Sequence, residues 1–183
     1  MTTQTEVIPG YVAGTWTIDS VHSDISFYVR HLGVSKVRGH FGEFEGTIVT
    51  AEDPLQSSVT AVIRTASVDT GNETRDAHVR NADFLDVEQF PEMTFTSTAI
   101  RAESAAVFQV DGELTLHGVT KPVTLELELN GFGTGFDGNA LAGFSAATEI
   151  SRSDFGVTGG AAGAAVGDKI RIALEIEAAA AKA

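Results

Sequence analysis

The alternation of apolar and polar residues along most of the chain is the feature that most restricts its fold. In the segment HSDISFYVRHL, Ile25, Phe27 and Val29 occupy every second position and polar or amphipathic residues fill the positions between them. Successive side chains of a β-strand point to opposite sides of the sheet. This spacing therefore predicts a strand with one buried face.

The same pattern recurs in TWTID, VRGHFGEFEGTI, SSVTAVIRTASV, MTFTSTAI, VFQVDGELTLHG, PVTLELELNG, ALAGFSAATEI and KIRIALEIE. About eight or nine strands is the number expected of one sheet that closes on itself. Several segments run to about ten residues, which favours a tilted barrel over a sandwich, although the sandwich stays an alternative. Glycines at Gly39, Gly42, Gly46 and Gly143 predict bulges or bends that curve the strands.

One dense polar block, residues 70–91, interrupts this alternation. Thr70 and Glu73 have the spacing of a capping box, and Pro91 ends the block before the next strand, so we expect a short helix between two strands. A free helix of about ten residues is marginal in water and has to dock. We expect it to cover one mouth of the barrel through the residues His78, Ala82, Phe84 and Leu85.

Charge and composition exclude several classes of partner. The chain of 183 residues carries 25 acidic and 12 basic residues, a formal charge of −13, which repels nucleic acid and anionic membrane surfaces. Cysteine is absent, so no disulfide or thiolate metal site can form. The N-terminus lacks the pattern of a signal peptide, and no segment is apolar over a bilayer-spanning length. We therefore expect a cytoplasmic protein without stable membrane insertion.

Motifs for catalysis are weak. The five histidines, at positions 22, 31, 40, 78 and 117, form no close metal-binding pair, and no Gly-x-Ser-x-Gly elbow occurs. The pairs Glu43 with Glu45 and Glu126 with Glu128 fit the solvated outer face of a strand better than an acid–base pair. We predict neither an enzyme nor a resident metal or cofactor. A metal- or haem-dependent enzyme built on histidines from separate strands stays an alternative.

Four segments resemble the YceI family of lipocalin-like polyisoprenoid-binding proteins. They are IDSVHSDISFYVRHLGVSKVRGHFGEFEGTI, TGNETRDAHVRNADFLDVEQFPEMTF, GELTLHGVTKPVTLELELNGFG, and GFSAATEISRSDFGV followed by VGDKIRIALEIE. The resemblance implies an all-β, antiparallel, eight-stranded lipocalin-like barrel with a short helical insertion. We predict a flexible arm over residues 1–13, the barrel over 14–178 and a tail over 179–183. Some relatives are dimers, so a homodimer is possible.

The resemblance also implies a ligand, a long-chain isoprenoid such as an isoprenoid quinone or a polyprenyl phosphate, stored, shielded or transported in the apolar interior. Our candidate wall residues lie on apolar strand faces or in the family segments: Phe27, Val29, Phe41, Phe44, Phe95, Leu114, Leu116 and Phe144. A polar head needs donors near a mouth, for which the candidates are Arg30, Arg38, His78 and Arg80.

The apolar residues have a second explanation, which is that they fill the barrel. An eight-stranded barrel is just wide enough either to be packed solid or to hold one small ligand, and composition does not decide between the two. A filled barrel would suit a stress-related protein-interaction module. The ligand carrier therefore requires a hollow interior.

Overall fold

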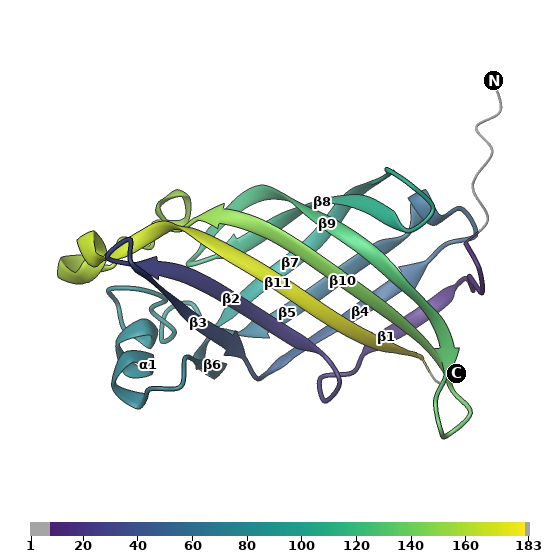
Figure 1. The fold of residues 1–183 in the computed structure, drawn as a ribbon, viewed down its shortest axis with the longest axis horizontal. Coiled ribbons are helices and arrows are strands. Elements are labelled where there is room, and N and C mark those ends of the chain that lie inside the picture. The colour runs from purple at the N-terminus through teal and green to yellow at the C-terminus, as the bar shows by residue number, and fades with distance from the viewer. Residues whose placement is uncertain (1–7, 182–183) are drawn as a thin grey trace.

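The computed structural model describes residues 8–181, which form one antiparallel sheet with a few short helices (Figure 1). The strands are β1 Gly14–Ile18, β2 Asp24–His31, β3 Ser35–Phe41, β4 Phe44–Thr50, β5 Ser58–Arg64, β6 Val68–Asp69, β7 Glu92–Ala102, β8 Val107–Leu116, β9 Val119–Thr134, β10 Ala140–Ser151 and β11 Val166–Ala180. The helices are α1 Glu73–Arg80 and the 3₁₀ turns η1 Pro54–Gln56, η2 Thr65–Ser67, η3 Arg152–Phe155 and η4 Gly160–Ala165.

Eight of these strands close into a ring in the order β1-β4-β5-β7-β8-β9-β10-β11, and β11 returns to β1. The short strand β1 completes the ring, because Trp16 pairs with Ile48 of β4 on one side and with Ala180 of β11 on the other. This ring confirms the predicted eight-stranded antiparallel barrel.

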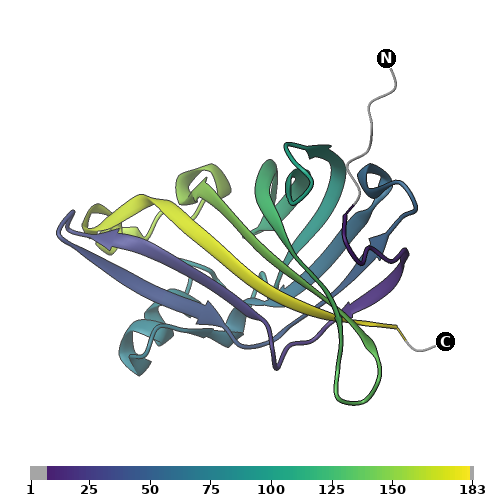
Figure 2. The same cartoon turned by 45° about the vertical axis from the view of Figure 1, so that its right-hand side comes forward.

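The other three strands extend the sheet beyond the ring. Strand β11 pairs with β1 only at residues 178–180. Nearer its N-terminus, residues 166–175 of β11 pair with β2, which pairs in turn with β3, and β3 pairs with β6. The β2–β3 hairpin therefore stands beside one end of the barrel (Figure 2). The sequence did not predict these three additional strands. The segments VRGHFGEFEGTI and SSVTAVIRTASV were each expected to form one strand, but the first divides at Gly42 into β3 and β4, and the second divides at η2 into β5 and β6.

Strand alternation is confirmed in the core. In β8, Phe108, Val110, Leu114 and Leu116 are buried, and the last three pack with inward residues of the neighbouring strands. The predicted irregularity at Gly143 is a register shift between Gly143 and Phe144 in the pairing of β10 with β9. Strand curvature of this kind allows the sheet to close.

The polar block forms the predicted short helix, but its cap differs from our expectation. The N-cap is Asn72, whose side chain accepts a hydrogen bond from the backbone N–H of Arg75. Thr70 instead donates its N–H and its hydroxyl to the buried carboxylate of Asp76. The capping box of Thr70 and Glu73 was therefore a wrong assignment. Asn is at least as good an N-cap as Thr, so the helix simply begins later.

Some residues of the predicted arm and tail contact the barrel, and the domain limits themselves stay a prediction. In the predicted N-terminal arm, the Tyr11 hydroxyl donates to the backbone oxygen of Ala51 over 2.5 Å. At the other end, β11 stays paired through Ala179 and Ala180, two residues into the predicted tail. The remaining parts of the arm and tail, residues 1–7 and 182–183, lie outside the described residues.

Candidate ligand-binding cavities

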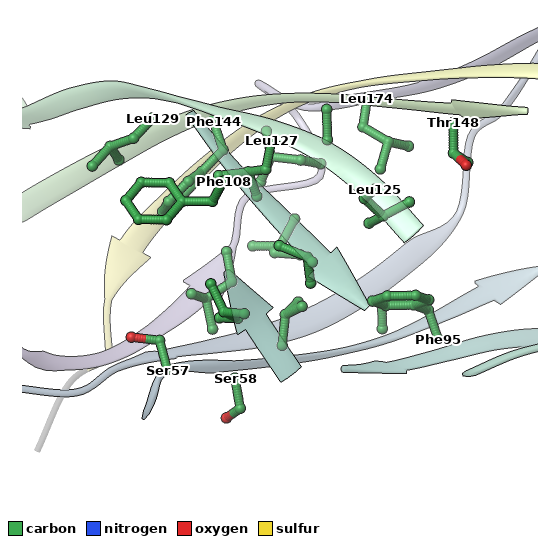
Figure 3. A pocket seen from close by; sticks show the side chains of 18 of the residues that line it. Ser57, Ser58, Phe95, Phe108, Leu125, Leu127, Leu129, Phe144, Thr148 and Leu174 are labelled. Atoms are coloured by element: carbon green, nitrogen blue, oxygen red, sulfur yellow. The ribbon is translucent and has the colours of Figure 1, made fainter. Parts of the chain in front are cut away.

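Inward side chains of the closed ring enclose a first cavity, with a volume of about 190 Å³. Figure 3 shows aromatic and leucine side chains from several strands gathered around this space. None of the described residues that line it carries a charged side chain. Its main walls are Phe44, Ile48, Ile63, Phe95, Phe108, Val110, Leu114, Leu125, Leu127, Leu129, Phe144, Ile172, Leu174 and Ile176.

Most of the few polar side chains on this cavity are already hydrogen-bonded to the protein. Thr50 accepts the indole N–H of Trp16 and donates to the backbone oxygen of Val12, each over 2.8 Å. Ser57 accepts the backbone N–H of Ala51 over 3.0 Å. Within residues 8–181, no buried side-chain nitrogen or oxygen lacks a hydrogen-bond partner. The first cavity therefore offers a ligand hydrocarbon contact and little else.

A second cavity, of about 310 Å³, lies between the β2–β3 hairpin, the region of α1 and the η4 turn. Val79, Phe84 and Leu85 from the helical insertion line it, so the insertion does cover this end of the barrel. Ile25, Met93 and Ile172 line both cavities. The two cavities therefore adjoin, with these three side chains as part of the wall of each.

Every titratable side chain that lines the second cavity is basic, namely Arg30, His31, Arg75, His78 and Arg152. No carboxylate is found among its described lining residues, although the protein carries a formal charge of −13. The first cavity is therefore apolar and uncharged, whereas the second has a cationic border.

These basic residues differ in how many of their donors the protein itself uses. The guanidinium of Arg152 makes five hydrogen bonds to the backbone oxygens of Gly167, Val157, Thr158, Gly163 and Val166, which accounts for all its N–H groups. It is a structural clamp with no donor left for a ligand.

Other donors on the same border remain available. Arg75 uses Nε and one Nη2 hydrogen on Thr70, which leaves its Nη1 group. Nε2 of His78 lies 2.9 Å from Oδ2 of Asp83. Arg30 is exposed and has no hydrogen bond or ion pair with any described residue. The strand register sets Arg30 opposite Lys36, on the outer face of the hairpin, so Arg75 is the arginine of this border that could still bind a polar head group.

The predicted wall residues divide between the two cavities. Those on the first are Phe44, Phe95, Leu114 and Phe144, and those on the second are Phe27, Val29, Phe41 and Leu116. Of the predicted head-group residues, Arg30 and His78 border the second cavity. Whether any of the ten contacts a ligand stays a prediction.

Two predicted head-group residues border neither cavity. Arg38 lies on the outer face of the hairpin, with its guanidinium carbon 5.5 Å from the centre of the Tyr28 ring. Arg80 donates to the backbone oxygens of Ala66 and Val68, each over 2.9 Å. Arg80 therefore joins α1 to the segment before it and does not face a cavity.

Sequence reasoning missed several lining residues for different reasons. Ile172, Leu125 and Leu127 lie at alternate positions of their strands, so the period-two pattern already contained them. Met93 also belongs to that pattern, because it lies two residues before Phe95 on β7. Arg75 could not be found in that way, because its position depends on how the helical insertion folds back. Arg152 stood in the SRSDFGV segment of the family resemblance, which was the available signal.

One group of potential metal ligands occurs among the described residues, and it lies outside both cavities. Asp19, His22 and Glu177 bring their ligand atoms within 4.8 Å of one another. A hydrogen bond from His22 lowers the pKa of Asp19, and the same bond raises the pKa of His22. An ordinary ion pair on the surface accounts for this arrangement, so it gives no support to a metal or haem enzyme in the barrel.

A model of the family described as YceI-like domain matches residues 16–178. Protein YceI of Salmonella arizonae is 43% identical over 150 residues, which cover 80% of this chain and 78% of that protein. The crystal structure of the Campylobacter jejuni YceI protein is 32% identical, with a TM-score of 0.74, and the match covers 84% of this chain and 90% of that one.

A polyisoprenoid binding domain from Saccharophagus degradans, implicated in plant cell wall breakdown, has the same fold at 16% identity. Its TM-score is 0.73, and the match covers 93% of this chain and 100% of that one.

Across residues 8–181, no helix has the length and apolar character needed to cross a bilayer.

Proposed function

The chain belongs to the YceI-like domain family, and on that premise we propose that it binds a long-chain isoprenoid in its barrel. The observation that carries the proposal is a pair of adjoining apolar cavities, an uncharged one of about 190 Å³ and one of about 310 Å³, which share Ile25, Met93 and Ile172 as wall residues. A neighbour of the same fold is a polyisoprenoid binding domain, which supports this class of ligand.

Desolvation supplies the driving force for such binding. Each methylene group moved from water into an apolar site contributes about 0.8 kcal/mol. Association costs at least about 4 kcal/mol in lost translational and rotational freedom, so several isoprene units have to be buried before binding becomes tight. We infer that the ligand chain passes between the three shared side chains from one cavity into the other. A chain ligand suits two adjoining cavities, because each further unit adds burial without a further association cost.

The charge distribution favours one orientation of the ligand. We infer that the hydrocarbon tail occupies the first cavity and that a polar head group lies at the cationic border of the second. Arg75 retains donors there, and no carboxylate among the described lining residues opposes an anion. A polyprenyl phosphate fits this border, as does a quinone whose carbonyl oxygens accept hydrogen bonds.

We propose storage, shielding or transport of the ligand rather than its chemical conversion. The hollow lumen argues against a protein-interaction module with a filled barrel. The histidines on the second cavity, His31 and His78, belong to no group of three potential metal ligands among the described residues. The cytoplasmic location and the homodimer stay predictions.

Occlusion of the first cavity tests the proposal. Ala146 is buried on β10 and lines this cavity, whereas its neighbour Ala147 is exposed on the outer face of the same strand. We expect Ala146→Phe to narrow this cavity and so to lower clearly the fraction of protein that shows, in native mass spectrometry, the mass shift of a bound long-chain polyprenyl phosphate. Ala147→Phe is the matched control and should bind like the wild type. The proposal fails if the wild type takes up neither this ligand nor an isoprenoid quinone, or if both variants bind normally.

A further inference from the structure

The tip of the β2–β3 hairpin exposes large apolar side chains. Leu32 is 65% exposed and Val34 is 86% exposed, although residues of this size usually avoid water. The turn that presents them places Leu32 at a φ of 53° and Gly33 at 68°. A leucine in this left-handed region is uncommon, and such conformations are concentrated at functional sites.

An uncharged segment continues this apolar tip. Residues 158–167, TGGAAGAAVG, contain no charged side chain, and Ala161 and Ala164 within them are exposed. The backbone N–H of Leu32 donates to the oxygen of Ala165 over 2.8 Å, so the two segments lie side by side. Both views show them at the same end of the molecule (Figures 1 and 2). We call residues 30–38 and 158–167 together the hairpin end.

The hairpin end borders the opening of the second cavity. Val29, Arg30 and His31 of the hairpin line that cavity, and Ala162 and Ala165 of the uncharged segment line it too. A surface that covered the hairpin end would therefore lie directly against the opening of the ligand space.

The hairpin is locally basic in a strongly acidic protein. Residues 28–40 contain Arg30, Lys36 and Arg38 and no acidic residue. The strand register sets Arg30 opposite Lys36 and Tyr28 opposite Arg38, so the three cations share the outer face. On the adjoining strand β11, Lys169 adds a cation, and the carboxylate of Asp168 already accepts the backbone N–H of Ser153.

We propose that the hairpin end docks on the surface of a bilayer that contains anionic lipid. Leu32 and Val34 would enter the interface, while Arg30, Lys36 and Arg38 contact lipid phosphates, since exposed apolar groups flanked by cations are typical of interfacial segments. The net charge of −13 predicts repulsion by such a surface, but the charge is distributed unevenly, and this end is the exception.

A lipid surface fits better than a second copy of this chain. Two hairpin ends in a symmetric dimer would bring their cations together, which opposes association. A lipid surface instead supplies anions for the cations, an apolar layer for Leu32 and Val34, and a source or sink for a lipophilic ligand. Transfer of a ligand between this surface and the barrel rests on the proposed function, whereas the docking itself does not.

Vesicle sedimentation tests the docking. We expect the wild type to sediment with vesicles of phosphatidylcholine and phosphatidylglycerol in equal parts, to stay unbound with phosphatidylcholine alone, and to dissociate at high salt. The double variant Leu32→Ser/Val34→Ser should weaken binding roughly tenfold or more. Lys36→Gln/Arg38→Gln should weaken it by a similar factor, because each cation near an anionic surface contributes to attraction.

The matched control is Phe136→Ser. Phe136 is a fully exposed apolar residue in the β9–β10 loop, at the other end of the barrel (Figure 1). We expect this variant to bind vesicles like the wild type. Docking by the hairpin end is refuted if the wild type ignores anionic vesicles, if Phe136→Ser causes the loss instead, or if the hairpin variants change the oligomeric state and leave vesicle binding intact.

A second readout separates this proposal from the function it extends. Leu32→Ser/Val34→Ser should still take up a polyprenyl phosphate presented in detergent, but should take it up more slowly from anionic vesicles. Wild type that docks on vesicles yet takes up no polyprenyl phosphate would refute the ligand and leave the docking in place. If the wild type takes up the ligand from detergent but does not dock on vesicles, the docking is refuted and the proposed ligand stands.

Discussion

Close packing inside the barrel fixes the identity of individual residues, and Gly112 on β8 is the sharpest case. A Cβ atom at this position would lie 2.3 Å from Cζ of Phe95 and 2.7 Å from the backbone oxygen of Thr96. We predict that Gly112→Ala lowers the free energy of unfolding by about 1–3 kcal/mol, because the Phe95 ring has to leave its position and the backbone oxygen of Thr96 cannot move without disturbing the strand pair. Denaturant titration measures this change.

The control for this prediction is Gly133→Ala on β9. No atom lies within 4 Å of the Cβ that this substitution adds, and the φ angle of Gly133 is outside the left-handed region. Its stability should stay within about 0.5 kcal/mol of the wild type. Equal stability of the two variants would show that Phe95 is able to move aside into the cavity.

The side-chain carboxyl of Asp76 makes the free energy of unfolding depend on pH in the acid range. Hydrogen bonding from Thr70 holds the pKa of this carboxyl below its ordinary value of 3.8, against the opposing effect of burial. A lowered folded-state pKa stabilises the protein above the unfolded pKa, and this contribution is lost as the pH falls through the folded pKa. We predict that Asp76→Asn costs about 2 kcal/mol at neutral pH. The difference from the wild type should shrink below about pH 4.

Urea unfolding over a series of pH values from neutral to acid measures this dependence. Glu88→Gln is the control, because Glu88 is exposed and has no hydrogen bond or ion pair with a described residue. A difference between Asp76→Asn and the wild type that stayed constant through the acid range would contradict the role assigned to the charged carboxylate.

Single residues also show what the sequence could not predict. Period-two alternation correctly placed Phe95 and Leu114 inward, because the pleat of a strand imposes that direction wherever one face is buried. It could not place Arg38 or Arg80, since a long side chain at a strand end or on a helix can turn to any of several partners. The partners of Arg80 are backbone oxygens, which no sequence pattern marks.

At the scale of elements, the segment from η3 to the start of β11 depends on one side chain. Arg152 holds it through five hydrogen bonds to backbone oxygens. We predict that Arg152→Lys leaves the barrel folded but speeds amide hydrogen exchange in residues 157–167 about tenfold or more, because an ammonium has three donors and no planar fork. Exchange followed by mass spectrometry measures this.

Arg171→Lys is the matched control for this element. Arg171 lies on β11 and pairs with Glu149 on the exposed face, so a lysine can replace most of its role. Exchange in residues 157–167 should not change in this variant. If Arg152→Lys also left exchange unchanged, the uncharged segment would be held by its own turns rather than by the clamp.

Elements were predicted better than their connections. The helical insertion over residues 70–91 was expected to cover a mouth of the barrel, and Val79, Phe84 and Leu85 do line the second cavity. The split of the sheet at β11 was not foreseen. A strand pattern records that one face is buried, but it does not record which neighbour pairs with each half of a long strand.

At the scale of the whole molecule, the decisive property is that the barrel is hollow. The sequence could not establish this, because the same alternation describes a packed lumen and an open one. The structure has small residues such as Ala61 and Ala146 among the lining residues, where larger ones would close the space. The hollow therefore arises from the sum of side-chain volumes around the ring, which is a property of no single segment.

This geometry makes ligand affinity depend on chain length. We predict that affinity for polyprenyl phosphates rises with each added isoprene unit until the chain fills both cavities, and then stays constant. Each buried methylene group contributes about 0.8 kcal/mol, and units beyond the opening stay in water and contribute nothing. A thermal-shift series reports the rise, because a ligand that binds the folded state alone raises the melting temperature with its affinity.

A variant that narrows the lumen distinguishes this mechanism from binding on the surface. In Ala146→Phe the first cavity is reduced while the cationic border is unchanged, so the plateau should occur at a shorter chain, and Ala147→Phe should reproduce the wild-type series. Affinity that kept rising with length in all three proteins would place the chain on the outer surface. Affinity independent of length would mean that the head group alone is bound, and in either case the barrel interior would not be the ligand site.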